Sequence, residues 1–508
     1  MATKQAKQVL LGALDQGTTS TRFIVFDQLG NTVASAQKEH TQIMPQAGWV
    51  EHDPMEIWTR VQEVMKLCMS QLPDPKSELA CIGITNQRET TICWNKHTGK
   101  PYGNAIVWMD TRTQPLCDEL SSNPLNQAMV KHKTGLPISM YFSGTKIRWM
   151  LDNLPECRRD SELGLAVAGT IDSWLMFQMS GEENRCHCTD VSNASRYMLM
   201  DLATLGWDQQ LCDLVGVPMA MLPTIQSSSQ VYFEAKYPQC VRGVKVSGVL
   251  GDQQSALVGQ CGFHPGMAKN TYGTGLFMLL NTGEELVRSD KLITTVAYQF
   301  GPKAKPVYAL EGSVAIGGAL VQWLRDNLGV ISNTSEVEIL AKQVDDTAGV
   351  CIVPAFSGLF APHWRSDARG TITGLTRFAD RRHICRAALE ATALQTRDVF
   401  EAMSSTSGEG VALTELRVDG GMVCNNLLMQ IQADLLDCQV TRPVVTETTA
   451  LGAVYAAGLA VGVWKDVEEI EGDWPGTECQ FNPGMSQAKR LATFARWNKA
   501  VAKSMDSV

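Results

Sequence analysis

Residues 15–22, which read Asp-Gln-Gly-Thr-Thr-Ser-Thr-Arg, combine a carboxylate, a glycine and consecutive hydroxyl side chains between two short apolar runs. The apolar runs predict strands over residues 11–14 and 23–26, with a tight turn between them. Gly17 would let backbone N–H groups approach an anion, and Asp15 could hold a hydrated Mg²⁺. Such a turn suits the phosphates of a nucleotide, although the Gly-Lys-Ser/Thr element of a Walker loop is missing. An ordinary hairpin turn would use the same residue types.

A second glycine- and threonine-rich turn follows far along the chain, at residues 272–275 (Tyr-Gly-Thr-Gly). It is again expected to join two strands, so Thr274 marks a second candidate phosphate turn, with a plain hairpin as the alternative. A third element is a strand predicted over residues 416–419, which is followed by two glycines. Gly421 would let a flat ring or a sugar lie against the backbone, and Asn425 could hydrogen-bond it, unless Asn425 only caps the following helix.

Polar side chains follow two other predicted strands, at residues 79–85 and 244–250. After the first, the neighbours Arg88 and Glu89 offer a donor fork and an acceptor that could recognise hydroxyl groups from both sides; the alternative is a surface ion pair. After the second, Asp252 could take a proton from a substrate hydroxyl, although a lone Asp there more often caps a helix. Ligands of open α/β sheets bind at the carboxyl ends of strands, which favours a site in both places.

The elements that carry these residues alternate between strand-like and helix-like segments, which predicts an α/β protein. A chain of 508 residues is too long for one core, so two domains are expected. The strand–turn–strand pattern restarts near residue 250 without a low-complexity linker, which predicts a duplicated fold closing on one ligand, with the boundary within residues 252–266. Asp53, followed by Pro54, is the expected N-cap of the first long helix. Further strands are expected over residues 277–280 and 307–310, and helices over residues 54–70, 145–153, 317–328, 383–403, 425–436 and 450–462.

Charge and composition exclude several classes of function. The net charge is −9 and the basic residues are scattered, so nucleic acid is not an expected partner. No apolar run is long enough to cross a bilayer, residues 1–5 lack the apolar core of a signal peptide, and residues 505–508 are not a peroxisomal signal, so no integral membrane segment and a cytoplasmic location are expected. Fifteen cysteines without a framework predict reduced thiols, and the Cys-His-Cys at residues 186–188 is spaced too tightly for a structural zinc pair.

Two longer segments carry a family resemblance. One is residues 141–153 (Tyr-Phe-Ser-Gly-Thr-Lys-Ile-Arg-Trp-Met-Leu-Asp-Asn); the other begins at residues 370–375 (Gly-Thr-Ile-Thr-Gly-Leu) and ends at residues 383–390 (His-Ile-Cys-Arg-Ala-Ala-Leu-Glu). With these signatures the chain resembles the FGGY carbohydrate kinases, in particular the members that act on glycerol, over about residues 8–465. This family belongs to the actin/sugar-kinase/Hsp70 ATPase superfamily. The resemblance therefore implies two duplicated ribonuclease H-like (actin-like ATPase) domains around a central cleft, at residues 1–258 and 259–508.

The resemblance also implies an activity: phosphoryl transfer from ATP to glycerol, giving sn-glycerol 3-phosphate, the first step of glycerol catabolism and a supply for lipid synthesis. It implies Asp252 as the general base, Asp15 as the residue associated with Mg²⁺, and a homo-oligomer, either a dimer or a tetramer. The substrate-binding residues that it implies are Arg88, Glu89, Trp108, Tyr141, Asp252, Gln253 and Phe277. The nucleotide-binding residues that it implies are Thr18, Thr19, Ser20, Arg22, Thr274, Gly318, Gln322, Gly421 and Asn425.

The chain departs from the family pattern at a few positions. Met109 stands where Gln is more familiar and Leu276 where Cys is usual, and neither change removes a functional group from the expected chemistry. Residues 237–244 lack the Gly-Gly-Thr-Arg motif with which bacterial members bind fructose 1,6-bisphosphate, so that regulation is not expected. Two alternatives remain: an FGGY kinase acting on a pentulose, a hexulose or another small polyol, and a non-catalytic nucleotide-binding scaffold, because actin and Hsp70 share the superfamily.

Overall fold

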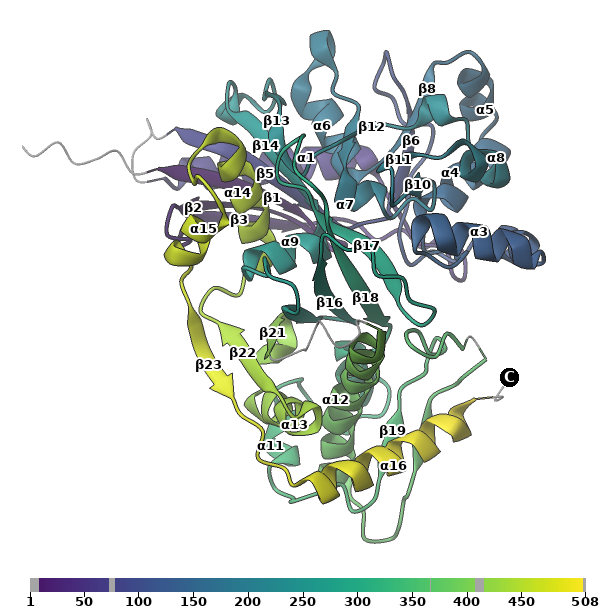
Figure 1. Ribbon diagram of the computed structural model, residues 1–508, viewed down its shortest axis with the longest axis vertical. Coiled ribbons are helices and arrows are strands. Elements are labelled where there is room, and N and C mark those ends of the chain that lie inside the picture. Colours follow the sequence, from purple (N-terminus) through teal and green to yellow (C-terminus); the bar gives the residue numbers. More distant parts are fainter. Residues whose placement is uncertain (1–8, 73–77, 366, 407–414, 506–508) are drawn as a thin grey trace, which may run out of the picture.

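The computed structural model describes residues 9–72, 78–365, 367–406 and 415–505 and consists of two lobes, with the N-terminal one uppermost in Figure 1. Each lobe is built on a mixed sheet. The N-terminal sheet has the strand order β13-β14-β5-β1-β2-β3. Its strands are β1 (Leu10–Gln16), β2 (Ser20–Asp27), β3 (Thr32–Glu39), β5 (Leu79–Asn86), β13 (Ser229–Glu234) and β14 (Lys245–Gly251).

The C-terminal sheet repeats this arrangement, with the strand order β17-β18-β16-β15-β21-β22-β23. In each sheet an antiparallel hairpin (β1-β2 or β15-β16) lies beside two parallel strands (β5 and β14, or β21 and β22). The repeated order is the duplication that the two glycine- and threonine-rich turns predicted. The strands are β15 (Ala268–Tyr272), β16 (Leu276–Gly283), β17 (Ile293–Tyr298), β18 (Val307–Val314), β21 (Glu415–Asp419), β22 (Gln439–Pro443) and β23 (Thr477–Phe481).

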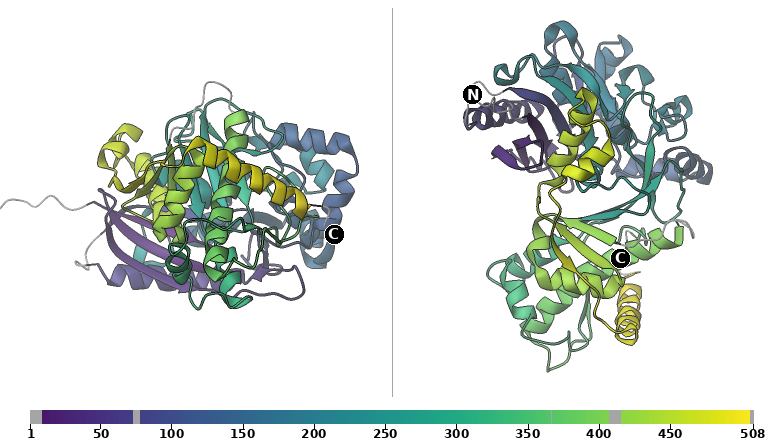
Figure 2. Two further views of the ribbon diagram at one scale, coloured as in Figure 1. Left: turned by 90° about the horizontal axis from the view of Figure 1, so that it is seen from below. Right: turned by 60° about the vertical axis from the view of Figure 1, so that its left-hand side comes forward.

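Helices cover the two sheets, and smaller sheets are inserted between the main strands (Figure 2). The short strands are β4 (Glu51–His52), β6 (Thr91–Asn95), β7 (Ala105–Ile106), β8 (Ala166–Thr170), β9 (Cys188–Asp190), β10 (Met200–Asp201), β11 (Gly206–Trp207), β12 (Thr224–Gln226), β19 (Cys351–Val353) and β20 (Thr371–Thr373). The helices of the N-terminal half are α1 (Pro54–Ser70), α2 (Gln114–Ser121), α3 (Pro124–Thr134), α4 (Ser143–Asn153), α5 (Pro155–Glu162), α6 (Ile171–Ser180), α7 (Val191–Ala194), α8 (Gln209–Val215) and α9 (Asp252–Gly259). Those that follow are α10 (Gly318–Asp326), α11 (Glu336–Ala341), α12 (Arg381–Thr406), α13 (Asn426–Leu436), α14 (Thr448–Val461), α15 (Val467–Asp473) and α16 (Gln487–Ser504).

Helix α14 comes late in the chain but packs on the N-terminal sheet, against β5, β14 and α9 (Figure 2). Glycines make this close approach possible. A Cβ on Gly83 of β5 would lie 2.1 Å from Ala453 O, and one on Gly259 would lie 1.9 Å from Thr448 O. The two halves are therefore interlocked, because a helix of the second half completes the packing of the first.

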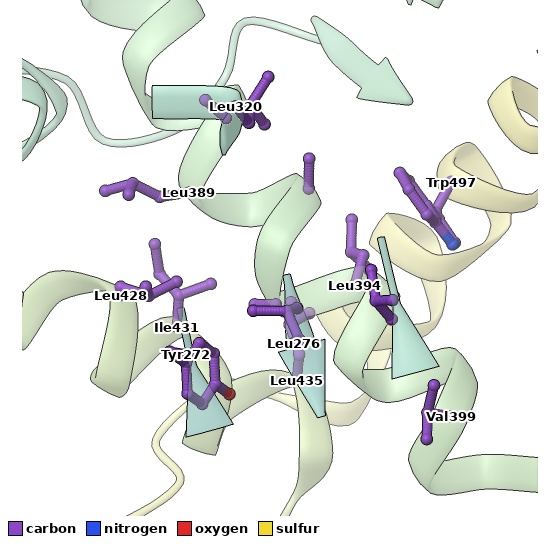
Figure 3. Packing of buried hydrophobic residues seen from close by; sticks show 14 of the residues in the cluster. Tyr272, Leu276, Leu320, Leu389, Leu394, Val399, Leu428, Ile431, Leu435 and Trp497 are labelled. Atoms are coloured by element: carbon purple, nitrogen blue, oxygen red, sulfur yellow. The ribbon is translucent and has the colours of Figure 1, made fainter. Parts of the chain in front are cut away.

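Apolar cores lie within each half and between the halves. In the C-terminal half, helices α10, α12 and α13 share one apolar cluster with the sheet, and Figure 3 shows members of that cluster, among them Leu320, Leu389 and Leu428 of the helices and Tyr272 and Leu276 of β15 and β16. The N-terminal core lies between its sheet and helices α1 and α6. A further cluster joins β14, α9, β16 and α14, so buried apolar surface also connects the two halves.

All the strands and helices predicted from the sequence are present, and most of the strands are longer than predicted. The strands β1, β5 and β18 continue beyond their predicted ends into buried polar residues, whereas β14 ends at Gly251. Asp53 is the N-cap of α1, as predicted, with its Oδ1 accepting from Met55 N–H at 2.8 Å. The boundary at residue 258 stays a prediction; it falls at the end of α9.

The structure also bears on the expectations about membrane segments, cysteines and metal ligands. No helix within the described ranges is long and apolar enough to cross a membrane. All fifteen cysteines are free, and the half-buried His187 has Nε2 2.9 Å from Ala168 O and its ring against Trp94. Among the described residues no three His, Cys, Asp or Glu side chains gather as a metal site. Residues 1–5 and 506–508, on which part of the localisation prediction depends, lie outside the described residues.

Candidate active site

Both glycine- and threonine-rich segments form hairpin turns. Gly17 N–H donates to Ser20 O at 3.0 Å between β1 and β2, and Gly273 N–H donates to Gly275 O at 2.9 Å between β15 and β16. The plain-hairpin alternative therefore describes their local conformation correctly. What decides their use is the direction in which their peptide groups face. The predicted nucleotide-binding residues carried by the first hairpin are Thr18, Thr19, Ser20 and Arg22.

Two glutamine side chains form hydrogen bonds with the carbonyl groups of the first turn. Gln87 Nε2 donates to Gly17 O at 3.2 Å, and Gln42 Nε2 donates to Thr18 O at 3.0 Å. In a trans peptide the N–H points opposite to the carbonyl. The N–H groups of Thr18 and Thr19 consequently face away from the two glutamines, as a turn that receives an anion requires.

The second turn is held in the same way, by the start of helix α10. Gly318 N–H donates to Gly273 O at 2.8 Å, and Gly317 N–H donates to Thr274 O at 2.8 Å. The Thr274 side chain is exposed, and Gln322 lies one turn further along α10, also exposed. Each half of the molecule thus presents one hairpin turn whose carbonyl groups are bound from behind.

Asp252 is the first residue of α9, directly after β14, and its side chain is 30% exposed. Its Oδ1 lies 3.3 Å from Arg88 Nε and accepts a hydrogen bond from Gln253 N–H at 2.8 Å. The N-cap position of α9 belongs to Gly251, so Asp252 does not serve as the cap. Burial raises the pKa of Asp252, whereas the positive charges of Arg88 and Lys269 oppose that rise. The carboxylate is therefore accessible and stands beside cations that favour its ionised form.

Arg88 and Glu89 are both buried, so the surface ion pair considered from the sequence is wrong. They are also not each other's main partners, because Arg88 Nε lies 3.8 Å from Glu89 Oε1. Arg88 instead forms a two-pronged contact with Glu311 of β18, at 2.6 and 2.9 Å. Glu89 is held by Arg196, whose Nε lies 2.5 Å from Glu89 Oε1. Glu89 has a positive φ of 59°, a backbone conformation that non-glycine residues rarely adopt and that clusters at functional sites.

Three aromatic rings stand together beside this charged cluster. Trp108, which follows β7, meets Tyr141 edge-on with ring centroids 5.7 Å apart and Phe277 of β16 at 6.2 Å. The guanidinium of Arg196 lies 5.4 Å from the Tyr141 ring and so connects the rings to the charged cluster. Trp108 Nε1 also donates to Thr18 Oγ1 at 2.9 Å. The predicted substrate-binding residues are thus in one place, and one of them contacts the first hairpin turn.

Two buried lysines support this arrangement. Lys269 of β15 donates to Gln253 Oε1 and to Thr271 Oγ1, at 2.5 and 2.8 Å. Burial lowers the pKa of Lys269 to about 8, although the charge of Asp252 among others opposes the shift. Lys146 of α4 donates to the carbonyl oxygen of Tyr141 at 2.5 Å and to those of both neighbouring residues, which fixes the segment that presents the Tyr141 ring.

The candidate adenosine site lies where α10 and the segment after β21 approach each other. A Cβ on Gly318 would lie 3.3 Å from Met422 Sδ, whereas a Cβ on Gly421 would meet nothing within 4 Å. The backbone at Gly421 is therefore open on the side where a flat group could lie. Asn425 is the N-cap of α13, with Oδ1 accepting from Leu428 N–H at 2.9 Å. Asn425 therefore caps α13 with its side-chain oxygen, as the capping alternative states. Its side-chain NH₂ group takes no part in that hydrogen bond.

Asp15, at the end of β1, is buried and forms an ion pair with Arg22 at 3.0 Å. Burial raises its pKa, although Arg22 opposes the shift. Its charge also raises the pKa of Asp252, so the two carboxylates lie near each other. Mg²⁺ at a phosphoryl-transfer site is commonly held by one or two carboxylates together with waters and substrate phosphates. A single buried aspartate between the first turn and Asp252 fits that donor set.

Sequence reasoning missed Glu311, Arg196, Lys269 and the two glutamines behind the first turn. Glu311 was outside the strand predicted over residues 307–310, because Glu-Gly-Ser has low strand propensity. The one local signal was a charged residue directly after an apolar strand, the same signal that identified Arg88 and Asp252. Arg196 and Gln42 lie in segments without a periodic pattern, and nothing in their surroundings singles them out.

Two copies of one mixed sheet, each with a hairpin turn held from behind, make this the two-domain sugar kinase fold of the actin-like ATPase type. Residues 10–259 match the FGGY family of carbohydrate kinases, N-terminal domain, and residues 268–461 match its C-terminal domain. The chain belongs to the FGGY family of carbohydrate kinases and is an enzyme.

Relatives over the full length are known. The chain is 56% identical to a glycerol kinase of Brucella anthropi over 497 residues, which cover 97% of this chain and 98% of that protein. It is 55% identical to a glycerol kinase of Paenarthrobacter aurescens, with 98% of both chains covered. The crystal structure of Plasmodium falciparum glycerol kinase with ADP is similar with a TM-score of 0.91, 39% identity and 99% coverage of both chains.

Proposed function

We propose that this enzyme transfers the terminal phosphate of ATP to glycerol, giving sn-glycerol 3-phosphate. The observation that carries the proposal is the accessible carboxylate of Asp252, which lies 3.3 Å from Nε of the buried Arg88 and feels the charge of Lys269, in a molecule whose two halves each present a hairpin turn with its carbonyl groups bound from behind. The similarity to curated glycerol kinases at 55–56% identity supports the choice of substrate.

In the proposed reaction, Arg88 and Glu89 bind hydroxyl groups of glycerol while the rings of Trp108, Tyr141 and Phe277 enclose its carbon chain. One N–H of Arg88 Nη2 is not used by Glu311 and is available to a hydroxyl oxygen. An analogue that lacks one hydroxyl leaves a buried polar group unpaired, which costs roughly 1–3 kcal/mol. Selectivity for the triol follows from that penalty.

The nucleotide is proposed to lie between the two hairpin turns. The N–H groups of the turns around Thr18 and Thr274 bind its phosphates, and the adenosine rests against Gly421, with Asn425, Gly318 and Gln322 nearby. Asp15 would hold Mg²⁺, which supplies charge neutralisation at the phosphates. Phosphoryl transfer needs mostly positioning and charge stabilisation, so a site rich in N–H and hydroxyl donors is the kind required.

Asp252 is proposed to accept the proton of the attacking hydroxyl group. Burial raises the pKa of Asp252, and the charges of Arg88 and Lys269 act the other way and favour the ionised carboxylate; a base must also be within hydrogen-bond reach of the proton that it takes. The partly exposed side chain leaves space for a hydroxyl group at that distance. Release of water from the site as the halves close would limit hydrolysis of ATP.

A coupled assay of ADP release, run with and without glycerol, tests the proposal. The expected result is ADP release that depends on glycerol, with one ADP formed for each sn-glycerol 3-phosphate. Release that depends instead on a pentulose, a hexulose or another polyol would move the assignment within the family. Release that no polyol stimulates would favour a nucleotide-binding scaffold. The homo-oligomer and the pathway role stay predictions from the resemblance, and the cytoplasmic location stays a prediction from the sequence.

A further inference from the structure

Glu311 lies on β18 of the C-terminal sheet, yet its carboxylate contacts two arginines of the N-terminal half. Its side chain has no exposed surface. Oε2 lies 2.6 Å from Arg88 Nη1, and Oε1 lies 2.9 Å from Arg88 Nη2 and 3.2 Å from Arg196 Nη2. Burial works to raise the pKa of Glu311, but the attraction of Arg196 and Arg88 outweighs it and lowers the pKa to about 2. The carboxylate is thus a fixed negative charge that both arginines share.

The two-pronged contact fixes the plane of the Arg88 guanidinium. Both Nη atoms face Glu311, and Nη1 also donates to Gln254 Oε1 at 3.2 Å, so the Nε edge is turned toward Asp252 at 3.3 Å. Fork-to-fork pairs of this kind give geometric specificity as well as energy. Without Glu311, nothing described around Arg88 would hold both Nη atoms on one side.

Arg196 extends the arrangement to the second polar group of the substrate site. Its Nη2 contacts Glu311, and its Nε contacts Glu89 Oε1. The four side chains of this cluster are all buried, and their charges sum to zero: Arg88, Arg196, Glu89 and Glu311. The Glu311 carboxylate therefore contacts Arg88 directly and is connected to Glu89 through Arg196. Arg88 and Glu89 are the donor and the acceptor that the proposed function assigns to glycerol binding.

We infer that Glu311 is a positioning residue through which the C-terminal half sets the orientation of Arg88 and, by way of Arg196, of Glu89. The inference rests on the proposed function, since it concerns how the glycerol-binding groups are held. The inference adds a link between the halves. A movement of β18 relative to β5 carries the Glu311 carboxylate away from Arg88, so the affinity for glycerol depends on the relative position of the two halves.

The alternative is a buried ion pair that only stabilises the fold. Breaking such a pair by removing one partner is destabilising because it leaves an uncompensated buried charge. A test must therefore separate the effect on substrate binding from the effect on folding. The kinetic constants for the two substrates provide this separation, because a general loss of structure has no reason to affect glycerol more than ATP.

Glu311→Gln keeps the shape of the side chain and removes its charge. We expect the KM for glycerol to rise about tenfold or more, the scale of displacing a binding group by a fraction of an ångström, while the KM for ATP changes less than about threefold. Glycerol should also lose most of its effect on the melting temperature of the variant, while ADP keeps its effect. Glu311→Asp keeps the charge but shortens the side chain, and it replaces Glu311→Gln if the latter does not fold.

Glu390→Gln is the matched control. Glu390 is also a largely buried glutamate of the C-terminal half with two arginine neighbours, at 3.9 Å from Arg386 and 3.5 Å from Arg496, but it lies outside the substrate cluster. It should lower stability without changing the ratio of the two KM values. If Glu311→Gln raises both KM values equally, or neither, the inference is overturned. A wild-type enzyme without glycerol-dependent ADP release would instead overturn the proposed function, and if another polyol is accepted the same comparison is made with that polyol.

Discussion

Asp252 Oδ1 lies 3.3 Å from Arg88 Nε, although the two residues come from different strand ends of the N-terminal sheet and are far apart in the sequence. The contact brings the proposed base and a proposed substrate-binding cation to the same point. β5 and β14 are parallel neighbours, so their carboxyl ends meet at one edge of the sheet.

Asp252→Asn should lower kcat by at least about a hundredfold, the scale of losing a general base. The amide keeps the shape and the contact with Gln253 but cannot accept the proton. Single-turnover measurement of product formation checks this without interference from product release. Asp53→Asn, at a helix start away from the site, is the control and should leave kcat unchanged, because Asn caps as well as Asp. An undiminished single-turnover rate for Asp252→Asn would exclude the role of base.

Arg88→Ala should raise the KM for glycerol more than the KM for ATP. The substitution removes the donor fork and leaves Glu311 as a buried, partly unpaired charge. Arg88→Lys keeps the charge but cannot form the two-pronged contact, so its glycerol KM should lie between those of the wild type and the alanine variant. Steady-state kinetics with each substrate varied in turn give both constants. Equal increases in both KM values would place Arg88 outside the glycerol site.

Lys269→Met should move the acid limb of the pH profile to higher pH. The base acts as a carboxylate, so kcat/KM falls as the pH drops through the pKa of Asp252. Lys269 lowers that pKa, and its removal therefore raises it and extends the inactive range upward. Lys269→Arg keeps a positive charge and should leave the limb near its wild-type position. A profile of kcat/KM against pH for the three proteins checks the shift, and identical acid limbs would contradict the electrostatic coupling.

Gly421→Ala should raise the KM for ATP without reducing stability. A Cβ at this position meets no protein atom within 4 Å, so it causes no steric clash in the fold. A ring or sugar lying against the backbone would be displaced by it. Gly472→Ala in α15 is matched, because its Cβ also meets nothing. Both variants should melt at about the wild-type temperature, and only Gly421→Ala should bind ATP more weakly. Unchanged ATP affinity would remove the adenosine site from this segment.

Gly83→Ala should destabilise the protein by roughly 1–3 kcal/mol or more, the usual cost of overpacking. Its Cβ would lie 2.1 Å from Ala453 O of α14, and a helix backbone cannot yield as a flexible side chain does. In Gly103→Ala the new Cβ makes an ordinary 3.4 Å contact with Leu154, so this control should keep its stability. Thermal denaturation of both variants measures the difference. Equal melting temperatures would mean that α14 does not pack on β5 as described.

Local patterns predicted much of the fold. The cap at Asp53, the two hairpin turns and the strand ends that carry Arg88 and Asp252 were all predicted, because each depends on residue types within a few positions. The lengths of strands such as β1 and β18 were underestimated, since the predictions 11–14 and 307–310 ended with the apolar run whereas the ladders continue into buried polar groups. The surface ion pair considered for Arg88 and Glu89 failed for the same reason: local sequence does not report burial.

The sequence by itself determined the duplicated α/β pattern, the turn chemistry and, through its signatures, the family. Only the tertiary structure decided which charges share one buried site. Arg88 and Glu311 are 223 residues apart in the chain, and no local pattern records a pairing that exists only once two sheets are packed together. Likewise, α14 reaches β5 because glycines on facing surfaces remove the side chains between them. Burial makes these contacts strong, and burial is a property of the whole fold.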